Sequence, residues 1–143
     1  MNQQAEVMNL GNTHYENPDG LDSPNQYTTA KDIATVLEHA LQNGHFKAIF
    51  TKKAYLSTAT NNHPDGVWMQ STVFHGLEKF EQNGFEIVGG KTGTTDKAGL
   101  CLATLAEKAG KEYIVVVMGV PYLSLNFPGN GQFEDTIKIL ENL

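Results

Sequence analysis

Eight consecutive residues in the second half of this 143-residue chain carry more polar donors than a purely structural segment requires. They read Val-Gly-Gly-Lys-Thr-Gly-Thr-Thr and span residues 88–95. Acyl transfer needs a positive charge beside the nucleophile and hydrogen-bond donors that face the oxyanion. The segment therefore predicts one wall of an acyl-transfer site, with Lys91 as its charged group.

Two other interpretations fit the same letters. A phosphate-binding P-loop needs a glycine five residues before Gly90, but Phe85 occupies that position. A P-loop must also open a helix, whereas Gly99 and the apolar residues after it favour a strand. The other alternative is a plain β-turn with a solvated lysine, and the Lys-Thr-Gly triplet alone does not exclude it.

The strongest predicted helix lies well before this segment, from about Thr29 to Asn43. Thr29 and Asp32 form a capping pair at its start, and Gly44 is expected to end it in a left-handed conformation. The apolar residues of this helix form one stripe at helical spacing: Ile33, Val36, Leu37, Ala40 and Leu41. The segment after it, residues 46–50, is apolar and its type stays open.

Strands are expected in the rest of the chain. Residues 55–60 and 67–74 are rich in β-branched and aromatic types and flank a turn cluster, which favours a hairpin. Three further strands are predicted over residues 85–94, 100–105 and 113–120. The last is apolar almost without a break, as is typical of a central strand buried on both faces.

The chain is expected to end in a helix from about Gly131 to Leu143, which would cover the sheet. Three successive antiparallel strands with a helix upstream and a helix downstream make an α+β pattern, an antiparallel sheet with flanking helices. The length of the chain indicates a single unit over residues 1–143.

Three separated segments resemble the low-molecular-mass penicillin-binding proteins, the serine-type D-alanyl-D-alanine carboxypeptidases. The segment from Lys91 to Leu102 is similar to the Lys-Thr-Gly strand of that family. Asn12 to Asp22 and Tyr27 to Ala34 resemble two earlier stretches of it, in the right order. The resemblance covers roughly residues 1–121 and implies a partial β-lactamase/transpeptidase-like fold.

The resemblance also implies roles for Lys91–Thr94, which we call the Lys-Thr-Gly wall. Lys91 would supply positive charge and help to organise proton transfer, and the backbone N–H of Thr94 would form half of the oxyanion hole. Thr92 would donate its hydroxyl to the terminal carboxylate of the substrate. Gly93 would leave room for the substrate backbone, which would pair with the strand edge by β-augmentation. The implied ligands are peptidoglycan stem peptides and β-lactams, without a cofactor.

Two motifs of the family are not where the resemblance requires them. Its nucleophile motif Ser-x-x-Lys is absent, because none of the four serines has a lysine three residues later. The letters Ser-x-Asn occur at 23–25 and 124–126, but neither place matches the family's order. Both motifs precede the matched segment in the family, so we expect residues 1–143 to be the C-terminal part of a penicillin-binding transpeptidase-like domain. Without the missing N-terminal half, the chain should be inactive.

The charged residues restrict the possible ligands. All ten basic residues are lysines, so the chain has none of the arginines that bind carboxylates in a bidentate manner. The residue that holds the substrate carboxylate together with Thr92 is therefore open. A net charge of −6 without a basic patch argues against a nucleic-acid partner. No metal is expected, because the five histidines form no i, i+4 pair and no carboxylate cluster has ligand spacing.

A non-catalytic relative that binds a peptide or a protein along a sheet edge is the alternative hypothesis. In both cases, missing neighbours would expose apolar sheet surface, so we expect a possible homo-oligomer through that surface. The resemblance implies an extracytoplasmic place in the bacterial cell envelope, with the export signal outside this chain. No apolar run approaches the length of a membrane span.

Overall fold

The computed structural model describes residues 1–122 and 129–143. Its centre is an antiparallel sheet of three strands in the order β3–β4–β5. These strands comprise Glu86–Thr95 (β3), Gly99–Lys108 (β4) and Lys111–Val120 (β5). Tight turns connect them, so each strand pairs with its neighbour in the sequence. All three predicted strands are thus present, and each is longer at one or both ends than the apolar pattern indicated.

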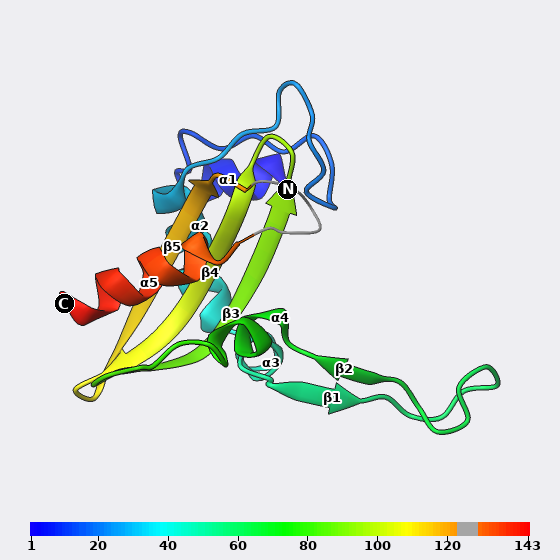
Figure 1. Ribbon diagram of the computed structural model, residues 1–143. Coiled ribbons are helices and arrows are strands. Elements are labelled where there is room, and N and C mark those ends of the chain that lie inside the picture. The colour runs from blue at the N-terminus through cyan, green and yellow to red at the C-terminus, as the bar shows by residue number, and fades with distance from the viewer. Residues whose placement is uncertain (123–128) are drawn as a thin grey trace.

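Helices cover both faces of this sheet (Figure 1). The C-terminal helix α5 (Gly131–Glu141) packs on one face, against β4 and β5. Helix α2 (Ala30–Leu41) packs on the other face, against β5. A short helix α1 (Asn2–Val7) precedes them. Within residues 1–122 and 129–143, no helix combines the length and the apolar character that a membrane span needs.

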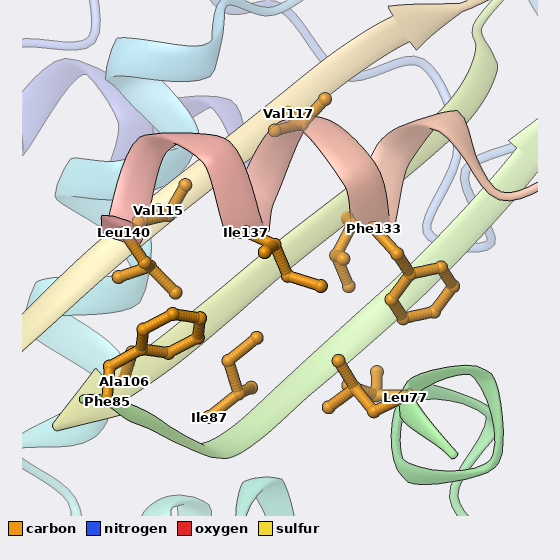
Figure 2. Close-up of a cluster of buried hydrophobic side chains, with 11 residues drawn as sticks. Leu77, Phe85, Ile87, Ala106, Val115, Val117, Phe133, Ile137 and Leu140 are labelled. Atoms are coloured by element: carbon orange, nitrogen blue, oxygen red, sulfur yellow. The ribbon is translucent and has the colours of Figure 1, made fainter. Parts of the chain in front are cut away.

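The hydrophobic core lies between α5 and the sheet (Figure 2). Its buried side chains are Val73, Leu77, Phe85, Ile87, Leu102, Ala106, Val115, Val117, Phe133, Ile137 and Leu140. Full burial of a large apolar side chain contributes about 1.5–3 kcal/mol relative to exposure. Leu140 is completely buried, whereas its neighbour Ile139 is 43% exposed. The helical period explains this, because Phe133, Ile137 and Leu140 share a face that Ile139 does not.

Helix α2 begins as the sequence indicated, because the side chain of Thr29 accepts a hydrogen bond from the backbone N–H of Asp32 at 3.1 Å. Its expected end is wrong in one respect. Gly44 is not left-handed and instead begins a further helix, α3 (Gly44–Phe50). The side chain of Asn43 accepts hydrogen bonds from the N–H groups of His45 and Phe46, and this N-cap starts the new helix.

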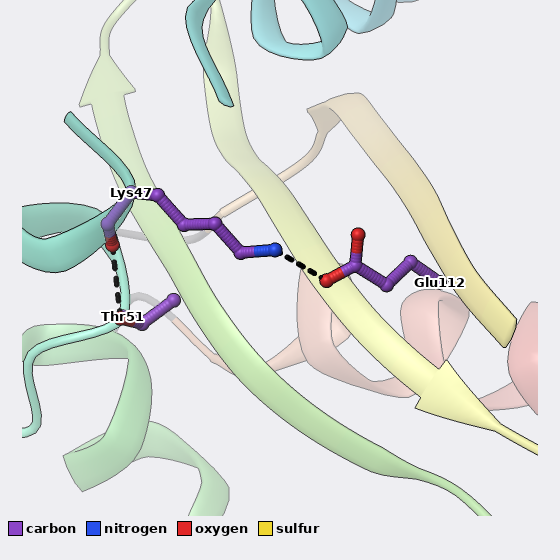
Figure 3. A network of polar contacts seen from close by, with 3 residues as sticks. All are labelled: Lys47, Thr51 and Glu112. Atoms are coloured by element: carbon purple, nitrogen blue, oxygen red, sulfur yellow. Dashed lines mark hydrogen bonds and ion pairs between the residues drawn. The ribbon is translucent and has the colours of Figure 1, made fainter. Parts of the chain in front are cut away.

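An ion pair orients α3 relative to the sheet. Figure 3 shows the Lys47 side chain extending from α3 to Glu112 of β5, with the Lys47 Nζ and Glu112 Oε1 atoms 2.5 Å apart. The hydroxyl of Thr51 donates to the Lys47 carbonyl oxygen at 2.9 Å and so closes the last turn of α3. An exposed ion pair of this kind contributes only about 0.2–1 kcal/mol, so it orients α3 rather than holding the fold together.

The prediction that β5 is a central strand is wrong for this sheet. In the part of the chain that the structure describes, β5 pairs only with β4, and β4 is the strand with a partner on each side. An apolar run reports that both faces of a strand are covered, and here α2 and α5 cover them. An apolar run does not indicate whether one or both edges of the strand are paired, because that depends on strands elsewhere in the chain.

The predicted hairpin is present but shorter than expected. It consists of β1 (Ala54–Leu56) and β2 (Trp68–Gln70), and it projects from the body of the molecule (Figure 1). Ser71 ends the second strand because it is the N-cap residue of helix α4 (Thr72–Leu77). Trp68, at the start of β2, is 67% exposed on this arm.

Candidate active site

The Lys-Thr-Gly wall lies along an open edge of the sheet. Among the described residues, β3 pairs with β4 on one side and has no strand on the other. Lys91, Gly93 and Thr94 are exposed, and Thr92 is partly buried. The structure therefore keeps the four predicted site residues together on one accessible strand edge, where backbone groups are free to pair with an extended ligand.

A β-bulge decides which way these side chains point. The register of β3 against β4 shifts between Ile87 and Gly89, which adds one residue to β3. Ile87 is buried in the core beneath α5. A Cβ at Gly89 would instead meet Phe50 and Thr51 on the α3 side. Without the extra residue, positions 87 and 89 would share a face, so the bulge redirects the rest of the strand.

The side chain of Lys91 lies on the α3 face, because Lys91 is two residues after Gly89 and residues two apart share a face of a strand. It borders an apolar cavity of about 1040 Å³. Aromatic residues from α3 and the hairpin line the same cavity, among them Phe46, Phe50 and Tyr55. The Lys91 ammonium donates a hydrogen bond to the carbonyl oxygen of Thr92. Its positive charge is thus held beside the strand edge and next to a space large enough for a ligand.

Gly93 stands in open space. Apart from its two neighbours in the chain, none of the described residues has an atom within 4 Å of a Cβ built on Gly93. Gly90 is different, because a Cβ there would lie 2.9 Å from the carbonyl oxygen of Ala103 and 3.1 Å from Val73 Cγ1. The packing of the chain itself explains the glycine at position 90, but it does not explain the glycine at position 93.

The hydroxyl of Thr92 has a partner that sequence reasoning missed. Its Oγ1 atom lies 2.7 Å from Oγ1 of Thr72, the first residue of α4. Position 72 fell within the expected strand over residues 67–74, and nothing in the local pattern marks it. Only the packing of α4 beside β3 brings the two hydroxyls together.

The far end of β3 is anchored to the first of the earlier family-like stretches. Asp22 accepts hydrogen bonds from the Thr95 hydroxyl at 2.7 Å and from the Lys97 N–H at 3.2 Å. The hydroxyl of Tyr122 donates to Asp96 at 2.6 Å, and this bond raises the pKa of Tyr122 above its usual value. The turn after the Lys-Thr-Gly wall is therefore fixed from two sides.

The two earlier stretches are also joined to each other. The buried carboxylate of Asp32 accepts hydrogen bonds from the Asn12 N–H at 3.1 Å and from the Thr13 hydroxyl at 2.7 Å. His14 and Tyr27 form a β-bridge between the same stretches. Asp32 thus lies in the first turn of α2 and also anchors the preceding loop to that helix. The three segments singled out in the sequence form one connected structure.

Two of the serines, Ser23 and Ser57, have structural hydrogen-bond partners. Ser23 and Asn25 both donate to the carboxylate of Glu16, and these bonds, that of Ser23 first, lower the pKa of Glu16. Ser57 accepts from the Val67 N–H within the hairpin. In the described part of the chain, no serine is hydrogen bonded to Lys91. The other Ser-x-Asn match, residues 124–126, lies outside the described residues.

Neither cysteine nor metal chemistry is indicated at the wall. Cys101 pairs with Gly93 across the β3–β4 ladder and is a free, partly buried thiol. Over residues 1–122 and 129–143, no three His, Cys, Asp or Glu side chains lie close enough together to hold a metal ion. What the site offers is an ammonium group, hydroxyl groups and free backbone groups on a strand edge.

Comparison with known proteins places this geometry in a family. The family model described as D-alanyl-D-alanine carboxypeptidase matches residues 1–122. D-alanyl-D-alanine carboxypeptidase DacD of Escherichia coli is 32% identical over 122 residues, which are 83% of this chain and 28% of that protein. The DacA enzyme of Haemophilus influenzae is 29% identical over 124 residues, which are 85% of this chain and 28% of that protein. The chain thus spans little more than a quarter of these relatives.

Solved structures give the same fold. The DD-transpeptidase of Streptomyces K15 superposes with a TM-score of 0.76 at 24% identity, covering 97% of this chain and 50% of that one. The D-alanyl-D-alanine carboxypeptidase DacD of Francisella tularensis gives a TM-score of 0.69 at 23% identity, with 98% and 42% covered. The expected α+β architecture, a partial transpeptidase-like fold, is confirmed.

Proposed function

The chain belongs to the D-alanyl-D-alanine carboxypeptidase family, and we propose on this basis that it carries one wall of a serine-type carboxypeptidase site. In this proposal residues 1–143 are the C-terminal part of a penicillin-binding transpeptidase-like domain. The observation that carries it is the open edge of β3, on which Lys91 to Thr94 lie exposed or partly exposed within the matched region.

The proposed reaction is acyl transfer from a peptide that ends in D-alanyl-D-alanine. A serine hydroxyl attacks the carbonyl carbon of the last peptide bond, and its proton passes to a neighbouring base. The tetrahedral oxyanion then collapses, the C–N bond breaks, and D-alanine leaves with a proton on its nitrogen. Water hydrolyses the acyl-serine and restores the hydroxyl. The serine belongs to a Ser-x-x-Lys motif, which these 143 residues do not contain.

Each residue of the wall has a role in this scheme that its position supports. Thr94 lies on an edge that carries no second strand among the described residues, and it directs its backbone N–H at the oxyanion. Gly93, with open space where a Cβ would stand, lets the peptide backbone lie against β3. Lys91 places its ammonium beside the reacting groups, where it stabilises negative charge and helps to move the proton. Thr92 donates to the carboxylate of the terminal D-alanine.

The proposed ligands follow from the family. Peptidoglycan stem peptides are the substrates, and β-lactams acylate the same serine. The protein works in the bacterial cell envelope, outside the cytoplasm. The missing N-terminal half of the domain is the first partner. Large exposed apolar residues that line the same cavity as Lys91, such as Ile49 (75%) and Tyr55 (48%), supply surface for it or for a second copy.

A non-catalytic function is the second candidate. The same exposed edge of β3 suits a module that binds a peptide or a protein by strand addition. The absence of Ser-x-x-Lys from the 143 residues favours this reading. The reading frame upstream of Met1 separates the two, since the carboxypeptidase requires that motif to be encoded there.

Labelling with a fluorescent penicillin tests the proposal. We expect no covalent label on the 143-residue chain and a stable label on a gene product that adds a Ser-x-x-Lys segment. A label on the 143-residue chain alone would show that the nucleophile lies within it. If the longer product stays unlabelled, the carboxypeptidase function is wrong and the binding module becomes the better account.

A further inference from the structure

Thr72 has no role in the family resemblance, yet it lies against a residue of the wall. The hydroxyl oxygens of Thr72 and Thr92 are 2.7 Å apart. We propose that Thr72 is a positioning residue for Thr92 in binding a C-terminal carboxylate. It donates its proton to Thr92 Oγ1 and so turns the Thr92 proton toward the ligand. This inference rests on the proposed function, because the ligand is a peptide with a free D-amino-acid carboxylate.

The chemistry of two hydroxyls gives the direction of the bond. Each threonine has one O–H proton and two acceptor lone pairs, and an ionised carboxylate can only accept. If Thr92 donates to Thr72, it has no proton left for the carboxylate. If Thr72 donates to Thr92, the Thr92 proton stays free. Hydrogen bonds arranged in series also polarise one another, which strengthens the last one, from Thr92 to the carboxylate.

The fold holds Thr72 in this place through its neighbour. Val73 is completely buried in the core, and its Cγ1 atom lies 3.1 Å from where a Cβ of Gly90 would stand. The absence of a side chain at Gly90 therefore lets α4 approach β3 closely. Gly90 and Thr92 share a face of the strand, because they are two residues apart beyond the bulge. Close packing of Val73 on Gly90 thus brings the hydroxyl of Thr72 to the hydroxyl of Thr92.

The Thr72–Thr92 pair also offers a way to bind a carboxylate in a chain that has no arginine. The chain has no arginine, so it cannot hold a carboxylate with a guanidinium fork. The Lys91 ammonium already donates one hydrogen bond to the Thr92 carbonyl oxygen. Thr72 is exposed and its hydroxyl is hydrogen bonded to that of Thr92. The two hydroxyls therefore lie together at the accessible edge of β3. A two-hydroxyl series beside an ammonium is an alternative way to bind one carboxylate.

Titration of the 143-residue chain with two matched ligands tests the proposal. The ligands are N-acetyl-D-alanyl-D-alanine and the same dipeptide with a C-terminal amide, and NMR shifts of Thr92 report binding. The wild-type chain should prefer the acid. Thr72→Val should weaken binding of the acid roughly fivefold, the loss expected for one net hydrogen bond, and leave the amide unchanged. Thr72→Ser keeps a hydroxyl and should bind the acid as the wild type does.

Two further variants make the result specific. Thr35→Val in α2 is the matched control, since the Thr35 hydroxyl donates to the Lys31 carbonyl oxygen within its own helix; its ligand preference should not change. Gly90→Ala should push α4 from β3 and reproduce the loss seen in Thr72→Val. The backbone NMR spectrum of each variant shows whether it is folded.

The possible failures are distinguishable. If Thr72→Val binds the acid normally while Thr92→Val does not, the positioning role is wrong and the proposed function stands. If Thr72→Ser loses as much affinity as Thr72→Val, a hydroxyl is not what matters at position 72, and the proposal also fails. If the wild-type chain does not prefer the acid, the carboxylate role of Thr92 is itself wrong. Penicillin labelling then tests independently whether the protein carries out the proposed acyl transfer.

Discussion

Thr95 at the end of β3 donates a hydrogen bond of 2.7 Å to Asp22, a residue 73 positions earlier in the chain. The same carboxylate accepts from the Lys97 N–H in the turn that follows. Asp22 belongs to the loop that Asp32 ties to α2 through Thr13. The position of the Lys-Thr-Gly wall therefore depends on a loop that is itself anchored to the helix on one face of the sheet.

Replacing Asp22 should loosen the turn after the wall. Asp22→Ala removes two hydrogen bonds at an exposed site, so the free energy of unfolding should fall by about 1 kcal/mol. Urea denaturation measures this. Asp65→Ala, in the exposed tip of the hairpin, is the control and should stay within about 0.5 kcal/mol of the wild type. Equal stability of Asp22→Ala and the wild type would mean that the turn does not need this anchor.

The two glycines of the wall region should respond in opposite ways. Gly90→Ala forces a Cβ against the Ala103 carbonyl oxygen and Val73, so it should destabilise the fold by about 1–3 kcal/mol. Gly93→Ala meets open space and should change stability by less than about 0.5 kcal/mol. Thermal denaturation compares them. A large loss of stability in Gly93→Ala would contradict a role for that glycine in leaving room for a ligand.

Glu16 should show a pKa that depends on Ser23. The bond from Ser23, followed by those from Asn25, lowers the Glu16 pKa in the folded state. A lowered folded-state pKa means that this group stabilises the fold above its ordinary pKa, and that the contribution is lost as pH falls through the folded value. In Ser23→Ala the pKa should rise toward the ordinary value of glutamate, as NMR titration can follow. An unchanged pKa would show that the Ser23 bond is not formed in solution.

The chain should associate with itself at high concentration. The strand β5 is long and apolar, and among the described residues its outer edge carries no paired strand. Such edges favour pairing with another chain. Light scattering over a concentration series should show dimers or larger species. Trp68→Ser removes an exposed side chain of the hairpin and leaves β5 intact, so it should not abolish association. A monomer at every concentration would contradict this prediction.

What the sequence could predict was decided by local interactions. The start of α2 was predictable because Thr29 and Asp32 are three residues apart, so that the Thr29 side chain can accept a hydrogen bond from the Asp32 N–H. The end of α2 was not predictable, because Gly44 is typical of a residue that follows a helix, whereas here Asn43 caps a new helix that begins at Gly44. Strands could be recognised by their apolar runs, but β5 was misplaced because strand order depends on residues distant in the sequence.

The site divides in the same way. The Lys-Thr-Gly wall is one continuous segment, so the sequence alone located Lys91 and its neighbours. Thr72 could not be found in this manner, because its link to Thr92 arises from the packing of α4 on β3 across 20 residues. Asp22 lies in a stretch that already resembled the family, yet its contact with Thr95 requires the folded chain.

Fluorescent penicillin labelling tests the central claim most directly, in a gene product that adds a Ser-x-x-Lys segment to these 143 residues. We predict that this protein is labelled, that Lys91→Ala slows labelling by roughly a hundredfold or more, and that the exposed-lysine control Lys97→Ala does not. The 143-residue chain alone should remain unlabelled. A label on the chain alone, or equal labelling of Lys91→Ala and the wild type, would contradict the account.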